Sequence, residues 1–117
     1  MKEILKGDVY YADLGPGLSS EQRGIRPVVI LQKYWSEKNS ADVIVGPITS
    51  SIKKKDLPTH IKLFKSEYPF LKKDSIISIE QVKTINKNNL KEYKGSLDDI
   101  TILKVENALN ISFGMFR

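Results

Sequence analysis

The sequence of 117 residues contains no cysteine, one histidine, five prolines and seven glycines. Without cysteine the chain has no disulfide, no thiolate nucleophile and no zinc–thiolate site, a composition that suits a reducing compartment. A single histidine excludes an acid–base pair of two histidines and a two-histidine metal site. No hydrophobic run approaches the roughly 20 residues that cross a bilayer, and the first residues lack a signal-peptide pattern. These absences predict a soluble, cytoplasmic protein with a single domain over residues 1–117.

The sequence also lacks the motifs that commonly hold cofactors. It has no Gly-x-x-x-x-Gly-Lys-Ser/Thr loop for the phosphates of a nucleotide. Gly15-Pro16-Gly17 is followed by a polar loop rather than by a helix, so it is interpreted as a turn. The acidic residues are scattered along the chain without the spacing of a metal cage. We therefore expect no cofactor and no bound metal.

Positive charge is concentrated in one quarter of the chain. The net charge is +5, and residues 50–73 hold seven lysines against two acidic residues, a local excess of 7 − 2 = +5. The remainder of the chain is therefore neutral. A localised cationic field is typical of proteins that bind a polyanion such as nucleic acid. A solvated lysine-rich loop explains the charge equally well, and charge alone leaves the choice open.

Short apolar runs between turn residues predict a mainly β fold with one C-terminal helix. The expected strands are residues 6–14, 27–32, 42–49, 59–64, 75–85 and a short one near 92–95. Alternation predicts His60 as an outward surface residue, and disturbed alternation around Glu80-Gln81 predicts a twist or bulge. The helix is expected to follow Ser96 as N-cap and to end at Gly114. We expect a small β-barrel-like sheet with this helix docked on it.

Two of the three arginines, Arg23 and Arg26, lie in one polar loop. A guanidinium grips phosphate oxygens with a planar fork that lysine lacks, and Arg26 directly precedes a strand that would hold it rigidly. Thr49 and Ser50 end the third predicted strand, and they approach Arg26 if the second and third strands pair. An ordinary salt-bridge arginine, and hydroxyls that merely end a strand, are the alternatives that remain open.

An ordered set of short segments resembles one protein family. The segments are Gly7-Asp8-Val9-Tyr10, Ser20-Glu21-Gln22, Gly24-Ile25-Arg26-Pro27-Val28-Val29-Ile30-Leu31, Ile48-Thr49-Ser50, Leu57-Pro58-Thr59-His60 and Ile79-Glu80-Gln81-Val82-Lys83-Thr84-Ile85. In this order and at these spacings they resemble the MazF/PemK-type endoribonuclease toxins of bacterial toxin–antitoxin modules. The similarity runs from about residue 6 to residue 114 and is closest to members from Gram-positive bacteria.

The resemblance implies an SH3-like small β-barrel with a C-terminal helix, a homodimer, and metal-independent cleavage of single-stranded RNA such as mRNA. In such enzymes the ribose 2′-hydroxyl attacks the adjacent phosphorus, which leaves a 2′,3′-cyclic phosphate and a 5′-hydroxyl. The catalytic pair of the family falls on Arg26 and Thr49. The residues expected to bind RNA are Ser20, Glu21, Gln22, Arg23, Ser50, Lys53, Lys54, Lys55, Glu80 and Gln81. Ser19 and Arg23 depart from many relatives, which places the base preference in question.

The resemblance also implies a partner, a MazE-like antitoxin whose flexible acidic tail occupies the basic RNA groove. Two other functions remain open on the same barrel. A gyrase-poisoning toxin relies on a C-terminal contact centred on tryptophan, whereas the single tryptophan here is Trp35. A plain SH3-like binding module would need neither Arg26 nor Thr49.

Overall fold

The computed structural model describes residues 3–15, 24–32, 41–50 and 57–114. The elements in these residues are β1 (Asp8–Asp13), β2 (Ile25–Ile30), β3 (Asp42–Thr49), β4 (His60–Leu63), β5 (Ser75–Ser78), η2 (Ile79–Gln81), β6 (Lys83–Asn86), η3 (Lys87–Asn89), β7 (Leu90–Ser96) and α1 (Asp99–Phe113). The predicted mainly β fold with a C-terminal helix is confirmed. No helix in the described part of the chain is long and apolar enough to cross a membrane.

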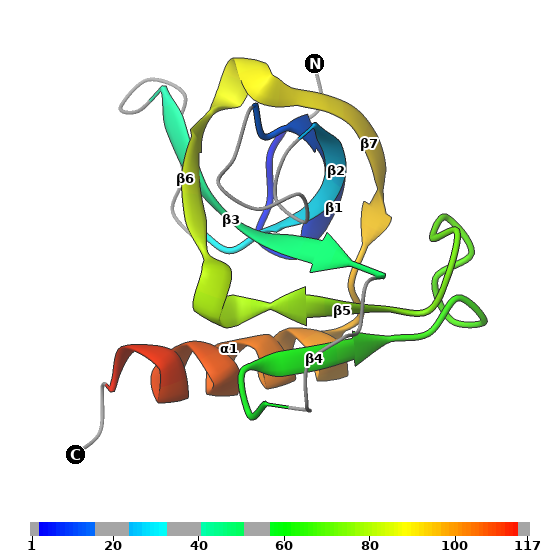
Figure 1. Ribbon diagram of the computed structural model, residues 1–117, viewed down its shortest axis with the longest axis vertical. Coiled ribbons are helices and arrows are strands. Elements are labelled where there is room, and N and C mark those ends of the chain that lie inside the picture. The colour runs from blue at the N-terminus through cyan, green and yellow to red at the C-terminus, as the bar shows by residue number, and fades with distance from the viewer. Residues whose placement is uncertain (1–2, 16–23, 33–40, 51–56, 115–117) are drawn as a thin grey trace.

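The strands pair in the order β4-β5-β3-β2-β1-β7, and β6 pairs with β3. β3 is the centre of this antiparallel sheet, because it pairs with β2, with β6 and, over its last two residues, with β5. β6 and β7 follow each other along the chain and curve around β1 and β2 (Figure 1). The path of paired strands ends at β4 and β7, so the described strands form an open sheet and a closed barrel is not shown.

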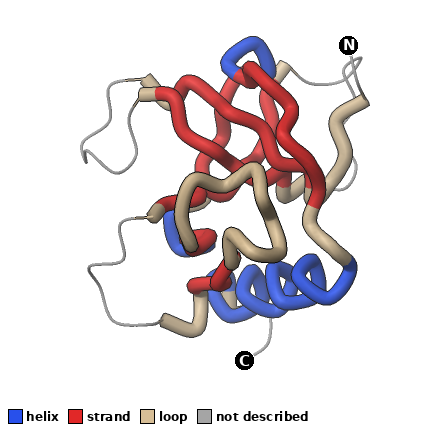
Figure 2. The backbone as a smooth tube through the Cα atoms, turned by 90° about the vertical axis from the view of Figure 1, so that its right-hand side faces the viewer, coloured by secondary structure: helices blue, strands red, loops and turns tan. Residues whose placement is uncertain are grey.

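The central strands supply side chains to two separate hydrophobic cores. Val28 and Ile30 point into a core enclosed by the curled sheet, whereas Val29 and Leu31 point into a second core that includes residues of α1. This division follows from the period of two along a strand. The helix lies along one side of the sheet (Figure 2). The apolar run of β2 is therefore buried on both faces, as predicted, although the strand begins at Ile25 rather than at residue 27.

The helix begins later than the sequence predicts. Asp98 is the N-cap, and its carboxylate accepts a hydrogen bond of 2.7 Å from the backbone N–H of Thr101. The predicted cap at Ser96 is wrong because its hydroxyl is used inside the sheet, where it donates to Asp8 Oδ1 at 2.8 Å. Gly114 ends the helix with a φ of +60°, as predicted.

Only part of the apolar stripe predicted on the helix is buried. Val105 and Ala108 enter the core, and Ile102 and Leu109 pack against it. The remaining apolar side chains of the helix are exposed, and these are Ile100, Leu103, Ile111 and Phe113. The helix therefore docks on the sheet with one face and presents a second apolar face outward.

The single strand predicted over residues 75–85 is wrong, because the chain turns in its middle. β5 pairs with β4 and with the end of β3, whereas β6 pairs with the beginning of β3. One straight strand cannot reach both ends of β3, so η2 redirects the chain between them. Ile79 in this turn is fully buried and donates its N–H to the carbonyl of Thr59. The disturbed alternation around Glu80 marks this turn.

Candidate active site

A cleft of about 380 Å³ lies where the beginning of β2, the end of β3 and the segment before β5 meet. The described residues that line it are Tyr11, Ile25, Arg26, Pro27, Ile48, Ser50, Phe70, Leu71, Lys72, Lys73 and Ser75. The topology explains its position. β3 leaves β2 after Pro47 and continues with β5, so the two strands separate at this end of the sheet.

The strand register brings Arg26 and Thr49 to the same end of the β2–β3 pair. The last pair between the two strands is Val28 with Pro47, and Arg26 and Thr49 each lie two residues beyond it, where the strands separate. Arg26 is half-buried and lines the cleft. Thr49 is only 6% exposed and lies between two residues that line it, Ile48 and Ser50.

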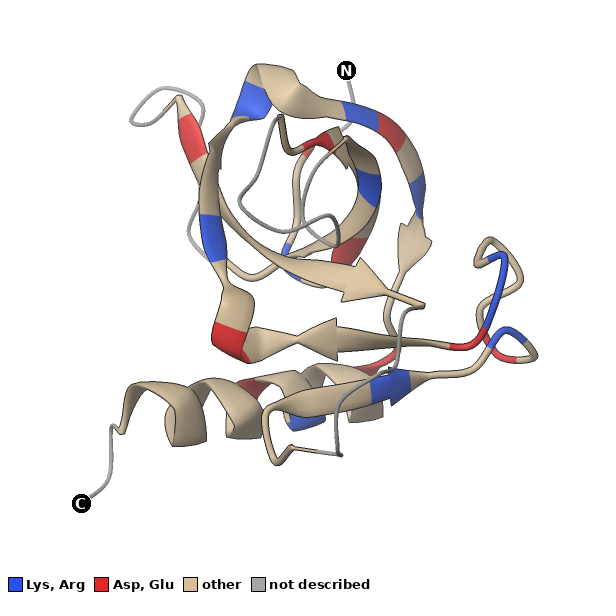
Figure 3. Ribbon diagram, viewed as in Figure 1, with Lys and Arg blue, Asp and Glu red and all other residues tan. Residues whose placement is uncertain are grey.

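Lys72 and Lys73 also line the cleft, and sequence reasoning did not select them. They lie on the connection between β4 and β5, which also carries Lys65 and shows blue segments at the right of Figure 3. Tyr68 fixes this connection, since its buried ring carries a hydroxyl that donates to Thr101 Oγ1 at 3.0 Å. The connection also packs against β7, because a Cβ at Gly95 would lie 2.8 Å from the Phe70 ring. The backbone beside both lysines is therefore held in place.

The cleft is built to receive an anion. Arg26, Lys72 and Lys73 are cationic, and no acidic side chain lines the cleft in the part of the chain that the structure describes. Ser50 and Ser75 add hydroxyl groups that donate hydrogen bonds. The Tyr11 ring forms one wall, and Lys94 Nζ lies 5.0 Å from its centroid. A phosphate ester with an attached base or sugar matches this combination of positive charge, hydroxyls and aromatic surface.

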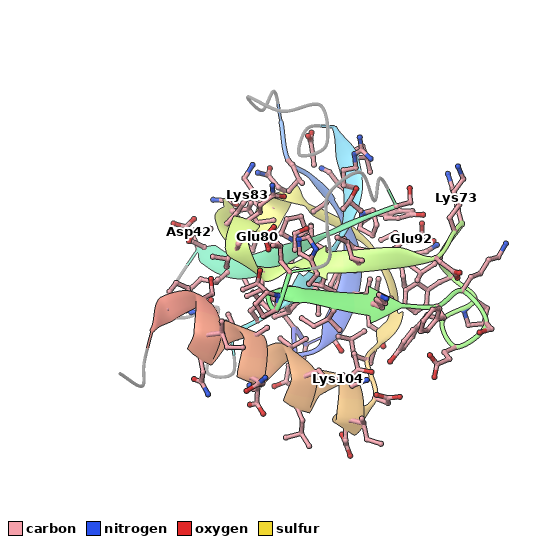
Figure 4. All side chains as sticks on the ribbon, turned by 60° about the horizontal axis from the view of Figure 1, so that its bottom comes forward. Asp42, Lys73, Glu80, Lys83, Glu92 and Lys104 are labelled. Atoms are coloured by element: carbon pink, nitrogen blue, oxygen red, sulfur yellow. The ribbon has the colours of Figure 1, made fainter. Side chains whose placement is uncertain are left out.

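Glu80 and Gln81 lie away from the cleft, at the other end of β5. Lys73 precedes this strand and Glu80 follows it, and Figure 4 shows the two side chains at its opposite ends. The structure therefore places Arg26 and Ser50 from the predicted site in the cleft, with Thr49 between two of its lining residues, and leaves Glu80 and Gln81 apart. The other predicted RNA contacts lie outside the described residues, and these are Ser20, Glu21, Gln22, Arg23, Lys53, Lys54 and Lys55.

Glu80 is held by two neighbours from the beginning of β4. Thr59 Oγ1 donates to Glu80 Oε1 at 2.8 Å, and His60 Nε2 lies 2.9 Å from Glu80 Oε2. Partial burial by itself raises the pKa of the Glu80 carboxyl, but the hydrogen bonds from His60 and Thr59 outweigh this effect and lower it. The prediction that His60 is an outward surface residue is only partly right, because His60 lies on the side of β4 opposite to Ile61 and Leu63 but its side chain is only 6% exposed.

In the described part of the chain, no group of three or more His, Asp or Glu residues could hold a metal ion. The functional side chains of the described residues thus form two separate groups. A cleft lined by cationic side chains lies at one end of β5, and the fixed Glu80 carboxylate lies at the other end.

Comparisons of the sequence with known proteins agree on one family. A model described as a PemK-like, MazF-like toxin of a type II toxin–antitoxin system matches residues 5–113. A curated endoribonuclease MazF from Staphylococcus saprophyticus is 50% identical over 110 residues, which are 94% of this chain and 91% of the relative. The endoribonuclease MazF of Staphylococcus epidermidis is 47% identical over 112 residues, 96% of this chain and 92% of the relative.

Solved structures agree with the sequence relatives. A mycobacterial endoribonuclease in complex with its cognate antitoxin superposes with a TM-score of 0.76 at 25% identity, over 97% of each chain. MazF from Deinococcus radiodurans shares the fold with a TM-score of 0.75 at 18% identity, over 95% of this chain and 96% of that one. The chain therefore belongs to the family of PemK-like, MazF-like toxins of type II toxin–antitoxin systems.

Proposed function

We propose that this protein is an endoribonuclease toxin that cleaves single-stranded RNA without a metal ion. The observation that carries the proposal is the cleft, in which Arg26 faces the same space as Lys72 and Lys73 and no described acidic side chain opposes them. RNA offers the matching chemistry, because its phosphates are anionic and its ribose supplies a nucleophile. The Staphylococcus relatives named endoribonuclease MazF support the same activity.

In the proposed reaction the ribose 2′-hydroxyl attacks the neighbouring phosphorus. The bond from phosphorus to the 5′-oxygen breaks, and the products carry a 2′,3′-cyclic phosphate and a 5′-hydroxyl. Negative charge builds up on the phosphoryl oxygens in the transition state, and donors fixed in advance stabilise it. Arg26 supplies a planar, permanently charged fork for these oxygens. Thr49, at the adjacent strand end, supplies a hydroxyl to the same group.

The single histidine takes no part in proton transfer at this cleft. Its ring contacts Glu80 at the other end of β5. Catalysis on this proposal therefore depends on electrostatic stabilisation by Arg26 and its neighbours rather than on a histidine base. Ser50 and the residues outside the described ranges, Ser20 to Arg23 and Lys53 to Lys55, extend the RNA contacts on either side of the scissile bond.

The proposal includes the partners that the resemblance implies. A MazE-like antitoxin with an acidic segment would compete with RNA for the positive charge of the cleft, and the mycobacterial relative was solved with its cognate antitoxin. We also propose a cytoplasmic homodimer, to which the exposed apolar face of α1 contributes. The curled sheet, in which β6 pairs with β3 and β7 pairs with β1, is on this proposal a variant of the SH3-like barrel that the resemblance implies, although the described strands leave it open.

The test is to incubate the purified protein with a mixed RNA pool in the presence of a metal chelator and to sequence the new ends. We expect cuts at a short recurring motif, with cyclic phosphate on one side and a 5′-hydroxyl on the other. An RNA pool that stays intact would reject the proposal and leave a binding module on the same fold. A parallel DNA gyrase assay tests the remaining alternative, and inhibition of gyrase without RNA cleavage would favour it.

A further inference from the structure

Tyr68 joins the connection between β4 and β5 to the first turn of α1. The residue is only 7% exposed and belongs to the hydrophobic core that includes residues of α1. Its hydroxyl donates to Thr101 Oγ1 at 3.0 Å and accepts the N–H of Asp98 at 3.2 Å. Asp98 is the N-cap of the helix and accepts from the N–H of Thr101. One buried side chain of the connection therefore binds both residues that begin the helix.

The other end of this contact leads to the cleft. The carbonyl of Tyr68 accepts the N–H of Leu71 at 2.9 Å, and the ring centroids of Tyr68 and Phe70 lie 5.8 Å apart. Phe70 and Leu71 line the cleft, and Lys72 and Lys73, which also line it, follow directly in the chain. A displacement of Tyr68 is therefore passed to both lysines through a hydrogen bond and a ring contact.

The shape of the connection and its position depend on different contacts. Asp74 Oδ1 accepts the N–H of Lys65 at 2.8 Å, which closes the connection into a loop. This bond keeps the loop closed but does not fasten it to the rest of the fold. The position of the loop depends on Phe70, which packs against Gly95 of β7, and on the Tyr68 hydroxyl, which binds α1.

We propose that Tyr68 is a positioning residue for RNA binding, through which the first turn of α1 holds Lys72 and Lys73 in the cleft. This inference depends on the function proposed above. A lysine ammonium is strongly hydrated and lies on a flexible stem, so it contributes to a phosphate site only when its backbone is held beside the phosphate. Neither Asp98 nor Thr101 is among the described residues that line the cleft. A change at the start of the helix should therefore weaken RNA binding although it removes no contact with RNA.

The inference is tested by measuring RNA affinity against salt concentration in an Arg26→Ala background, in which we expect cleavage to be lost. Tyr68→Phe keeps the buried ring and removes the hydroxyl. We expect the affinity to fall by about three- to tenfold, and the slope of log affinity against log salt to become shallower. Thr101→Val, which removes the acceptor of the hydroxyl, should act in the same direction.

Tyr10→Phe is the matched control for the loss of a tyrosine hydroxyl. Tyr10 is also buried, but it lies in the other core, which the curled sheet encloses. We expect this control to leave the RNA affinity and its salt dependence unchanged.

The combination of Tyr68→Phe with Lys72→Ala/Lys73→Ala separates a positioning role from a merely structural one. If Tyr68 acts through the two lysines, its substitution should change RNA affinity by less than about twofold once they are absent. A general loss of structure would instead lower the affinity by the same factor with and without the lysines. In the protein that retains Arg26, Tyr68→Phe should raise KM and leave kcat nearly unchanged, because it removes no group from the reaction.

A further measurement needs no RNA. Amide hydrogen exchange at Leu71 reports on the connection, because this N–H donates to the carbonyl of Tyr68. We expect Tyr68→Phe and Thr101→Val to accelerate this exchange by about three- to tenfold and Tyr10→Phe to leave it unchanged. If Tyr68→Phe does not fold, Thr101→Val takes its place in the affinity measurements.

The outcomes distinguish the two proposals. If the unmodified protein cuts no RNA, the proposed function fails and the positioning role fails with it. If it cuts RNA and Tyr68→Phe lowers the affinity equally with and without the lysines, the function stands and the inference is overturned. Unchanged exchange at Leu71 in Tyr68→Phe would also overturn it, because the hydroxyl would then not hold the connection.

Discussion

Gly7 and Ile102 approach each other so closely that a Cβ at position 7 would lie 2.7 Å from Ile102 Cδ1. Gly7 has a φ of +88°, a conformation that favours glycine. Its N–H donates to the carbonyl of Ile30, and its carbonyl accepts the N–H of Leu97. This one residue therefore joins the end of β2, the entry to β1 and the segment that leads into α1.

We predict that Gly7→Ala lowers the free energy of unfolding by about 2–4 kcal/mol, through a strained φ and a steric clash. Gly15→Ala is the matched control, because Gly15 also has a positive φ but, among the described residues, has no atom within 4 Å of its would-be Cβ. The control substitution should lower the free energy of unfolding by about 1 kcal/mol. Urea unfolding measures the free energy of unfolding of both variants. An equal decrease in the two would show that the contact with Ile102 is unimportant.

Arg26→Ala should reduce RNA cleavage by about a hundredfold or more, because it removes a donor to the transition-state charge. The side chain lines the cleft and is half-buried, so the fold should be retained, which circular dichroism would show. Lys104→Ala is the control, since Lys104 lies on α1 far from Lys73 (Figure 4). Full activity in a folded Arg26→Ala protein would contradict the assignment.

Thr49 is tested by two substitutions, one of similar volume and one that removes a buried methyl group. Thr49→Val removes the hydroxyl, and Thr49→Ser keeps it. We expect Thr49→Val to lose at least about tenfold in kcat, because one hydrogen bond to the reacting group is lost, whereas Thr49→Ser retains most of the activity. Single-turnover kinetics on a short RNA separate this effect from substrate binding. Equal activity in the two variants would leave Thr49 as a packing residue of β3.

Lys72 and Lys73 should contribute to affinity rather than to chemistry. Each phosphate contact that is lost makes the slope of log affinity against log salt shallower by about 0.7 for a single strand. In an Arg26→Ala background, which prevents cleavage, Lys72→Ala/Lys73→Ala should therefore change the slope by about 1.4. The same salt titration of RNA affinity is applied to the triple alanine variant of Lys53, Lys54 and Lys55. The change in slope then shows which of the two lysine groups makes more phosphate contacts. An unchanged slope would place the RNA elsewhere.

The lowered pKa of Glu80 predicts a loss of stability in acid. A carboxyl group with a folded-state pKa below its usual 4.5 stabilises the fold above that pH, and this contribution disappears as the pH falls through the lowered value. Glu80→Gln should therefore be less stable than the unmodified protein at pH 7, and the difference should shrink toward pH 2. Thermal unfolding between pH 2 and pH 7 measures the difference in stability between the two proteins. A difference that grows as the pH falls would contradict the lowered pKa of Glu80.

The local elements of this fold follow from the sequence, because short apolar runs, prolines and glycines determine them. β3 is predicted with its observed bounds, and Gly114 ends the helix as expected. Ser96 is a good N-cap by residue type, but a contact with Asp8, 88 residues away, takes its hydroxyl. The helix-capping preference of a residue type carries no information about hydrogen-bond partners that lie far away in the sequence.

The candidate site is predicted only in part for the same reason. Arg26 and Thr49 could be selected because each lies at the end of a recognisable strand. Lys72 and Lys73 reach the cleft only because the connection before β5 folds back and is fixed by Tyr68 and Gly95. The sequence predicts His60 as a surface residue, because the alternation of β4 does not reveal that η2 returns a carboxylate to it.

The pairing of β1 with β7 has a consequence for synthesis of the toxin. β1 begins at residue 8, whereas its partner β7 ends at residue 96, so one edge of β1 has no neighbour until most of the chain has left the ribosome. Domains gain their cooperativity only when such distant contacts form. A nascent chain that already displays Arg26 and Thr49 therefore lacks the connection that places Lys72 and Lys73 beside them. Assembly of the cleft is delayed until translation is almost finished.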